Sequence, residues 1–173
     1  IMAQMGCFVP ANLRFQPVDR VLIRIGASDS MLNHQSTFMV EMEDIAYMLY
    51  HATENSLVII DELGRGTSTH DGISIAHAVI EHLHNNVKAK TLCSTHFHEL
   101  SALDQTLSRV KNIHAEAIET AEGVKLTYRI VQGIGSKSFG INVATLAGLP
   151  ESVIQRSQTL MNMYENDPKN NVS

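Results

Sequence analysis

The stretch Leu57-Val58-Ile59-Ile60-Asp61-Glu62 joins four apolar residues directly to two adjacent carboxylates. A short apolar run of this kind is typical of a strand that is buried on both faces of a parallel sheet. Ligands of such sheets bind outside the carboxyl ends of the strands, so we expect Asp61 and Glu62 to lie at a binding site. One carboxylate there could hold Mg²⁺, and the other could position a water that attacks a phosphate. The same six residues also fit an ordinary core strand that ends in a solvated turn.

The residues that follow predict a β-strand, α-helix, β-strand unit. Residues 64–72 are rich in glycine and hydroxyl side chains, which predicts a loop rather than a helix. A helix with apolar residues at helical spacing comes next, and residues 89–95 form a second short strand that ends at His96. Right-handed crossover places Asp61, Glu62 and His96 at one edge of adjacent parallel strands. This convergence favours a binding site over simple packing. The apolar strand that ends at Asp61 and Glu62 then has the Walker B pattern of nucleotide hydrolases.

Five stretches of the sequence fit one known protein family. The longest is residues 61–72 (DELGRGTSTHDG), and the others are residues 36–42 (STFMVEM), 94–97 (STHF), 8–11 (FVPA) and 25–29 (IGASD). Together they resemble the ATPase domain of the MutS family of DNA mismatch-repair proteins, over nearly the whole chain. The resemblance implies an α/β fold of three layers, of the ABC-type or P-loop NTPase-like kind, with helices at its C-terminal end. It also implies ATP and Mg²⁺ as cofactors.

The resemblance implies a role for each residue at the proposed sheet edge. Asp61 would serve the metal ion, and Glu62 would position the attacking water. His96 would sense the γ-phosphate of ATP, although a histidine at the end of a strand is often only a capping or core residue. The predicted roles of the two carboxylates are therefore supported by both the strand pattern and the resemblance. The predicted role of His96 is supported mainly by the resemblance.

Further residues would bind the nucleotide. Ser36 could be an ordinary helix N-cap, but a helix N-terminus also suits an anion, and the resemblance implies that it reaches the partner chain's γ-phosphate. Thr67, Ser68 and Asp71 lie in the loop that would act across the same dimer. The resemblance also allows Tyr128 to stack on the adenine, whereas most tyrosines in such strands pack on the sheet.

The 173 residues contain no Walker A loop, Gly-x-x-x-x-Gly-Lys-[Ser/Thr], which would cradle the phosphates of ATP. Residues 133–138 come near to it, but Ser136 precedes the lysine and the spacing fails. In the family this loop lies shortly before the segment that opens the chain, and residues 1–8 look like the tail of a helix. We therefore expect a fragment that is inactive alone, from a protein whose other parts supply the first strand, the phosphate loop and the mismatch-binding domains.

The chain length and the charge limit what the chain does alone. At 173 residues it can bury a core but is unsuited to two full domains. Its formal net charge is −5, from 13 basic and 18 acidic residues, and the sequence has no basic stripe typical of nucleic-acid binding. Mismatched duplex DNA would therefore be bound by domains outside this chain.

The cysteines and the hydropathy bear on the cellular compartment. Cys7 and Cys93 are far apart in sequence and in apolar settings, which predicts free thiols in a reducing compartment. No apolar run approaches the roughly 20 residues that span a bilayer, so we expect no membrane partner. A bacterial protein would lie in the cytoplasm or nucleoid, and the sequence leaves an organelle or nucleus open.

The remaining pattern predicts further elements and a division of the chain. We expect residues 1–150 to form the partial ATPase domain, 151–165 a dimerisation helix and 166–173 a disordered tail. Within the first part the expected elements are a strand at 18–25, a loop at 26–35, a helix from Ser36, a hairpin of 109–119 with 124–131, and a helix at 141–147.

The sequence leaves the partners and two other functions open. The implied partner is a second MutS-family chain, in a homodimer or a heterodimer, together with other mismatch-repair proteins. Alternatively, the chain could be an interaction module without activity, using the apolar side of residues 151–165. Another ABC-type DNA-maintenance ATPase is disfavoured, because Ser36-Thr37-Phe38-Met39 replaces the Leu-Ser-Gly-Gly signature of that class.

Overall fold

The computed structural model describes residues 1–26, 36–120, 123–135 and 139–165. The chain divides into two compact units, Ile1–Val110 and Lys111–Ser173, and each is considered by itself. The loop expected at 26–35 lies almost wholly outside the described residues, as do residues 136–138 of the near match to a phosphate loop and the tail expected at 166–173.

The first unit is built on a parallel sheet in the order β1-β2-β3. The strands are β1 (Val21–Arg24), β2 (Leu57–Ile60) and β3 (Lys90–Cys93), and Arg24, Ile60 and Cys93 lie side by side in the register. The predicted strand, helix, strand unit is therefore confirmed. The strand expected at 18–25 is also present, but it spans only four residues.

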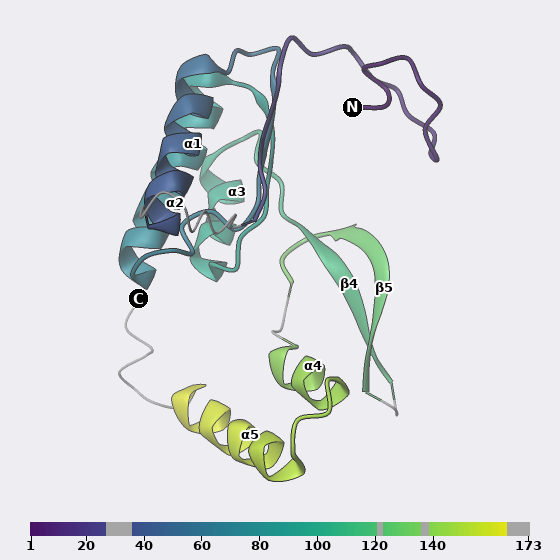
Figure 1. Ribbon diagram of the computed structural model, residues 1–173, viewed down its shortest axis with the longest axis vertical. Helices are drawn as coiled ribbons and strands as arrows, with labels where there is room; N and C mark the ends of the chain where they lie inside the picture. The colour runs from purple at the N-terminus through teal and green to yellow at the C-terminus, as the bar shows by residue number, and fades with distance from the viewer. Residues whose placement is uncertain (27–35, 121–122, 136–138, 166–173) are drawn as a thin grey trace. The chain divides into compact units, whose positions relative to one another are not determined.

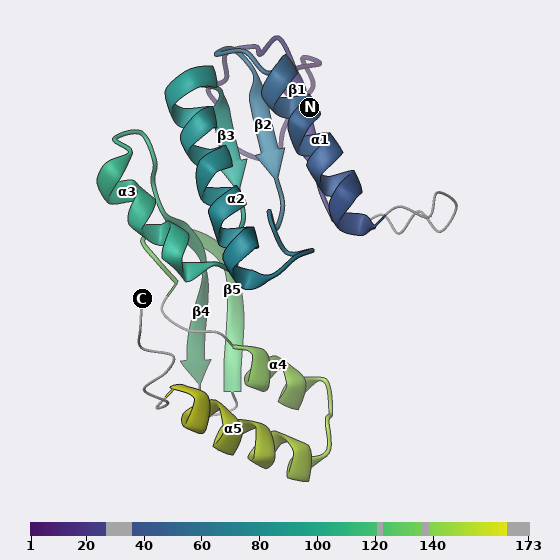
Figure 2. The ribbon, with the colours of Figure 1, turned by 90° about the vertical axis from the view of Figure 1, so that its left-hand side faces the viewer.

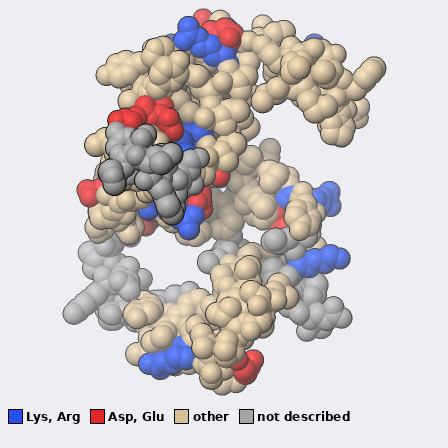
Figure 3. Space-filling model, viewed as in Figure 1, with Lys and Arg blue, Asp and Glu red and all other residues tan. Residues whose placement is uncertain are grey.

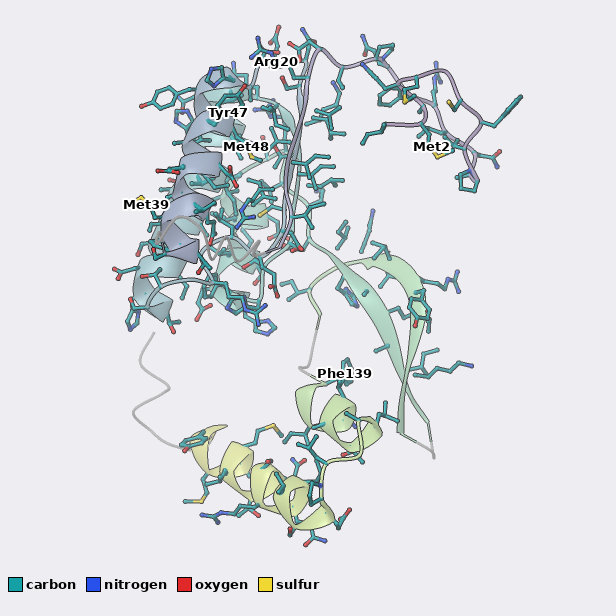
Figure 4. All side chains as sticks on the ribbon, in the orientation of Figure 1. Met2, Arg20, Met39, Tyr47, Met48 and Phe139 are labelled. Atoms are coloured by element: carbon teal, nitrogen blue, oxygen red, sulfur yellow. The ribbon has the colours of Figure 1, made fainter. Side chains whose placement is uncertain are left out.

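Two long helices, α1 (Thr37–His51) and α2 (Thr69–His82), lie on the same side of this sheet (Figures 1 and 2). A π-helical turn, η1 (Leu83–Val87), extends α2. Met48 lies between α1 and the strands, whereas Met39 is on the outer side of the helix (Figure 4). The core of the unit joins these helices to the buried side of β2, with Val58 and Ile60 at 0% and 2% exposure.

The opposite face of the sheet is not fully buried, so the expectation of burial on both faces is wrong for this unit. Ile23, Ile59 and Leu92 lie side by side there, and Ile23 and Leu92 are 40% and 55% exposed. The reason is that the long helices of the unit cover only the other side. Within the described residues this unit shows two layers, a sheet and a helical layer, rather than three.

Two short helices continue the unit after β3. They are the 3₁₀ helix η2 (His98–Ala102) and α3 (Leu103–Thr106). Phe97, Leu100, Leu103 and Leu107 are buried there and belong to the same core as α1 and α2. The segment after the predicted site therefore anchors the carboxyl end of β3.

The second unit contains a hairpin and two helices. Strands β4 (Ile113–Thr120) and β5 (Gly123–Gln132) pair antiparallel, with an irregular register between Ala115 and Ala117, and the predicted hairpin is thereby confirmed. Helices α4 (Gly140–Leu146) and α5 (Glu151–Glu165) follow, and α5 has the predicted bounds. Gly148 adopts φ +80° between them, which suits a residue that ends a helix.

The first residues form one turn with the hydrogen bonds of a helix end. The Cys7 N–H donates to the Met2 carbonyl at 2.9 Å, and the Gly6 N–H donates to the Ala3 carbonyl at 3.0 Å. Gly6 has φ +76°, and this pair of bonds with a left-handed residue is the Schellman pattern. The turn agrees with the expectation that residues 1–8 contain the end of a helix.

The visible surface mixes charges of both signs with large uncharged areas (Figure 3). Both cysteines are free thiols, and Cys93 is partly buried, whereas Cys7 is exposed rather than in the apolar setting expected for it. Among the described residues, none of the helices has the length and apolar character needed to cross a membrane.

Asp19, just before β1, is hydrogen-bonded to the residues just before β2, and this contact should make the stability of the fold depend on acidic pH. Its carboxylate accepts hydrogen bonds from the hydroxyls of Thr53 at 2.5 Å and Ser56 at 2.7 Å. These bonds, with that of Thr53 the larger cause, hold the pKa of Asp19 below its usual 3.8. Ionised Asp19 therefore stabilises the fold above pH 3.8, and this contribution is lost as the pH falls through the lowered pKa.

We expect Thr53→Val to be more destabilising at pH 6 than near pH 2, because the hydroxyl favours the ionised carboxylate. Urea unfolding of the wild type and the variant across this range measures the difference in free energy. Asp19→Asn should remove the pH dependence of that difference. A constant difference at all pH values would contradict the assignment.

Candidate functional site

The carboxyl ends of β2 and β3 bring Asp61, Glu62 and Ser94 together. The Ser94 hydroxyl donates to Asp61 Oδ1 at 2.5 Å and accepts from the Glu62 N–H at 3.0 Å. The Asp61 N–H and the Ser94 N–H continue the sheet, donating to the Arg24 and Ile60 carbonyls at 2.9 Å each. The predicted meeting of the two strand ends is thus confirmed, with Ser94 linking them.

Glu62 adopts a backbone conformation that its side chain disfavours. Its φ is +53°, in the left-handed region where most residues with a Cβ are uncommon. The exposed Glu62 carboxylate forms an ion pair with Arg65, three residues later. Residues held in such conformations occur often at functional sites, where the surrounding structure keeps them in place.

His96 lies three residues after β3 and is exposed. Its ring contacts the ring of Phe97, with centroids 4.2 Å apart and planes tilted by 41°. Phe97 is buried at 7% exposure, so it anchors the segment while His96 faces solvent. The structure therefore puts His96 near the sheet edge, without an interaction that would assign it a chemical role.

The glycine-rich segment after Glu62 packs tightly on its surroundings. A Cβ added at Gly64, where φ is +85°, would lie 2.7 Å from the Gly72 carbonyl oxygen. A Cβ added at Gly66 would lie 2.9 Å from Phe38 Cβ, and one at Gly72 would lie 2.9 Å from the Phe97 ring. The glycines are needed because the backbone approaches other atoms too closely for a side chain.

The expectation that all of residues 64–72 form a loop is wrong, because α2 already begins at Thr69. Ser68 is the N-cap, and its hydroxyl accepts from the Asp71 N–H at 3.3 Å and donates to Asp71 Oδ2 at 2.8 Å. This is close to the reciprocal arrangement of a capping box, which stabilises a helix start despite poor helix formers. Ser68 and Asp71, both predicted to bind nucleotide, are thus also capping residues, while Thr67 is partly buried beside them.

Ser36 is the N-cap of α1, as its sequence position predicts. Its hydroxyl accepts from the Met39 N–H at 3.1 Å, and the residue is exposed. The exposed helix start leaves N–H groups that could meet an anion. The cap is therefore established by the geometry, and a contact with nucleotide stays a prediction.

Two residues at the site carry interactions that the pattern did not predict. One is Ser94, and the other is Glu41, which is 8% exposed and accepts from the Gly64 N–H at 2.7 Å. A signal for Glu41 existed, because Glu41, Ile45 and Met48 are the buried residues of α1 at helical spacing.

Cys93 ends β3 beneath the site. Burial raises the pKa of its thiol to about 11, and the negative charge of Asp61 adds to this. The thiol therefore stays protonated near neutral pH, and a protonated thiol is a poor nucleophile and metal ligand. Cys93 is best understood as a small apolar residue of the sheet.

Tyr128, in the second unit, does not pack on its hairpin. It has φ +57° and its side chain is 90% exposed, where the register of β4 and β5 is irregular. The alternative that its ring packs on the sheet is therefore wrong. The ring is available to a ligand, and adenine stacking stays a prediction.

Comparison with known proteins assigns the chain to a family. The sequence model of the family described as MutS domain V matches residues 1–165. The chain belongs to the MutS domain V family. The resemblance carried by residues 36–42, 61–72 and 94–97 is thereby confirmed.

Several relatives bear the name DNA mismatch repair protein MutS. The protein from Halalkalibacterium halodurans is 51% identical over 168 residues, covering 96% of this chain and 19% of the relative. The protein from Geobacillus kaustophilus is 51% identical over 162 residues, covering 93% of this chain and 18% of the relative. The protein from Listeria monocytogenes is 49% identical over 170 residues, covering 98% of this chain and 20% of the relative. This MutS domain V chain thus spans about a fifth of the length of the curated relatives it matches.

Proposed function

We propose that this MutS domain V chain forms part of an enzyme that hydrolyses ATP with Mg²⁺ and couples hydrolysis to recognition of mismatched DNA. The observation that carries the proposal is that the Ser94 hydroxyl joins the ends of β2 and β3. It donates a hydrogen bond to the Asp61 carboxylate at 2.5 Å and accepts one from the Glu62 N–H at 3.0 Å. Adjacent carboxylates at the carboxyl edge of a parallel sheet suit a metal ion and an attacking water. The name of the relatives supports the link with mismatch repair.

Each residue has a proposed task in that reaction. Asp61 offers hard oxygen ligands of the kind that Mg²⁺ prefers, directly or through water, and Glu62 holds the attacking water. His96 senses the γ-phosphate, and Tyr128 stacks on the adenine. Among the described residues no three His, Cys, Asp or Glu side chains gather as a metal site, so water and phosphate oxygens would complete the magnesium shell.

The proposal includes a dimer of MutS-family chains, either identical or different. Ser36, with Thr67, Ser68 and Asp71, would then act on the nucleotide bound by the partner. Mismatched duplex DNA and other repair proteins would bind through other parts of the whole protein. The proposed fold is a three-layer P-loop NTPase-like domain. In that fold the sheet of β1–β3 would be the central layer, and a further layer would cover its open face. The bacterial relatives favour the cytoplasm as the location.

The test of the proposal compares the 173-residue chain with the whole protein that contains it. Without a Walker A loop, residues 1–173 should bind Mg-ATP weakly or not at all in a calorimetric titration, because phosphates need its backbone N–H groups and lysine. The whole protein should bind Mg-ATP and hydrolyse it. Micromolar binding by the 173 residues, or no hydrolysis by the whole protein, would contradict the proposal.

Ser94 gives a prediction about magnesium. Ser94→Ala in the whole protein should raise the Mg²⁺ concentration for half-maximal ATPase activity by about tenfold or more, since a hydrogen bond to a charged group contributes roughly 1.5–3 kcal/mol. Ser94→Thr keeps the hydroxyl and should behave like the wild type, as should Ser108→Ala at an exposed serine elsewhere. An unchanged Mg²⁺ requirement in Ser94→Ala would show that the junction does not orient Asp61.

A second function is favoured by the apolar surface of α4 and α5. Val143 and Leu146 on α4 are 56% and 68% exposed, and Val153 and Met163 on α5 are 44% and 59% exposed. The two helices contact each other, and exposed apolar side chains that gather into a large patch mark interaction sites. The second unit would then be a dimerisation module, and this role is compatible with ATP hydrolysis by the whole protein.

A further inference from the structure

Glu41 places a carboxylate on the buried side of α1, where the proposed mechanism gives it no task. The residue is 8% exposed, and its Oε1 accepts from the Gly64 N–H at 2.7 Å. A buried carboxylate is costly unless it is hydrogen-bonded, and an apolar residue would suit the stripe formed with Ile45 and Met48. The acceptor oxygen therefore points to a specific role for this side chain.

A second contact joins the same helix to the same loop. Phe38 lies one turn before Glu41, and its Cβ would be 2.9 Å from a Cβ added at Gly66. The first turns of α1 thus hold the loop at two points, by a hydrogen bond and by close packing. Ser36 caps this helix only two residues before Phe38.

The loop has little freedom to adopt another path. Gly64 has φ +85° and abuts the backbone of Gly72, and it follows Glu62 by two residues. Its N–H is in a buried position, where a donor without an acceptor is destabilising. Loss of the Glu41 oxygen would leave this N–H without an acceptor, and would therefore weaken the hold of α1 on the segment that carries Glu62, Thr67 and Ser68.

We infer that Glu41 is a positioning residue that fixes the loop of residues 64–68 to the Ser36 end of α1, so that both act as one rigid element. The inference rests on the proposed function, which assigns Ser36 and the loop hydroxyls to the same nucleotide. The essential property is the acceptor oxygen rather than the negative charge. Glutamine, which keeps an acceptor of the same reach, should therefore replace glutamate.

The test uses the whole protein with Glu41→Leu and Glu41→Gln. Glu41→Leu should lower kcat by about tenfold or more, because a catalytic group displaced by about 1 Å can cost on the order of 10²-fold. Mg-ATP affinity should stay within about threefold, since the phosphate loop itself is untouched. Glu41→Gln should keep kcat near the wild type. Hydrogen exchange of a peptide covering residues 61–68 should accelerate in Glu41→Leu only.

Glu54→Leu, at an exposed carboxylate in the turn after α1, is the matched control and should leave kcat and exchange unchanged. Should Glu41→Leu fail to fold, Gly66→Ala forces the loop away from Phe38 without touching Glu41 and should reproduce the loss of kcat. Normal kcat in folded Glu41→Leu, or equal loss in Glu41→Gln, overturns the inference. Absence of hydrolysis in the wild type, or full activity in Glu62→Gln, overturns the proposed function instead.

Discussion

Glu62→Gln in the whole protein should reduce ATP hydrolysis by about two orders of magnitude or more, the scale for a lost general base. The amide keeps the size and polarity of the side chain but removes the charge that polarises the attacking water. Nucleotide binding should survive, because the proposed metal contact belongs to Asp61. Steady-state ATPase assays and equilibrium binding of Mg-ATP measure the two effects separately.

The ion pair between Glu62 and Arg65 requires its own control, since Glu62→Gln removes that as well. Arg65→Gln breaks the same pair but leaves the Glu62 carboxylate in place. An exposed pair contributes only about 0–1 kcal/mol, so Arg65→Gln should reduce hydrolysis far less than Glu62→Gln. Hydrolysis by Glu62→Gln within a few-fold of the wild type would show that Glu62 is not the base. Equal losses in both variants would assign the effect to the ion pair.

Dimers that mix two inactive chains should regain activity if Ser36 acts on the partner's nucleotide. One chain carries Ser36→Ala, and the other has its phosphate-loop lysine replaced. Each homodimer should lose about 10²-fold or more, the scale for removing one donor to a developing negative charge. In the mixed dimer one site keeps both an intact loop and an intact Ser36, so about half of the wild-type rate should return.

Because Ser36 is the N-cap of α1, a control variant is needed to separate a contact with the partner's nucleotide from helix capping. Asparagine caps a helix as well as serine does, so Ser36→Asn preserves the cap but not the hydroxyl. A trans contact predicts that Ser36→Asn resembles Ser36→Ala, whereas a capping role predicts near-normal activity. Mixed dimers as inactive as both homodimers would show that Ser36 works within its own chain or only caps α1.

Local pattern was sufficient to predict the sheet edge that carries Asp61 and Glu62. The apolar run of β2 ends at these carboxylates, and strands joined by a helical crossover pair in parallel, so that their carboxyl ends meet at one edge. The start of α2 was missed because Gly72 and the hydroxyl residues disfavour a helix, while capping by Ser68 and Asp71 outweighs this. Burial of the second sheet face was overestimated because covering elements cannot be deduced from the strand itself.

The finer contacts of the site required the three-dimensional register. Ser94 reaches Asp61 because Ile60 and Cys93 are neighbours in the parallel pair, which the sequence does not specify. The contact of Glu41 with Gly64 joins residues 23 positions apart and depends on how α1 packs over the loop. Roles that depend on bound ATP, such as those of His96 and Tyr128, stay predictions because no contact within the chain reports on them.

The left-handed backbone at Glu62 has an evolutionary consequence. Glycine or asparagine would occupy φ +53° with less strain, and such replacements commonly stabilise a fold. Neither could supply the carboxylate that the proposed hydrolysis requires. Selection for a more stable domain and selection for turnover therefore favour different residues at position 62, and stabilising substitutions found there should come at the expense of activity.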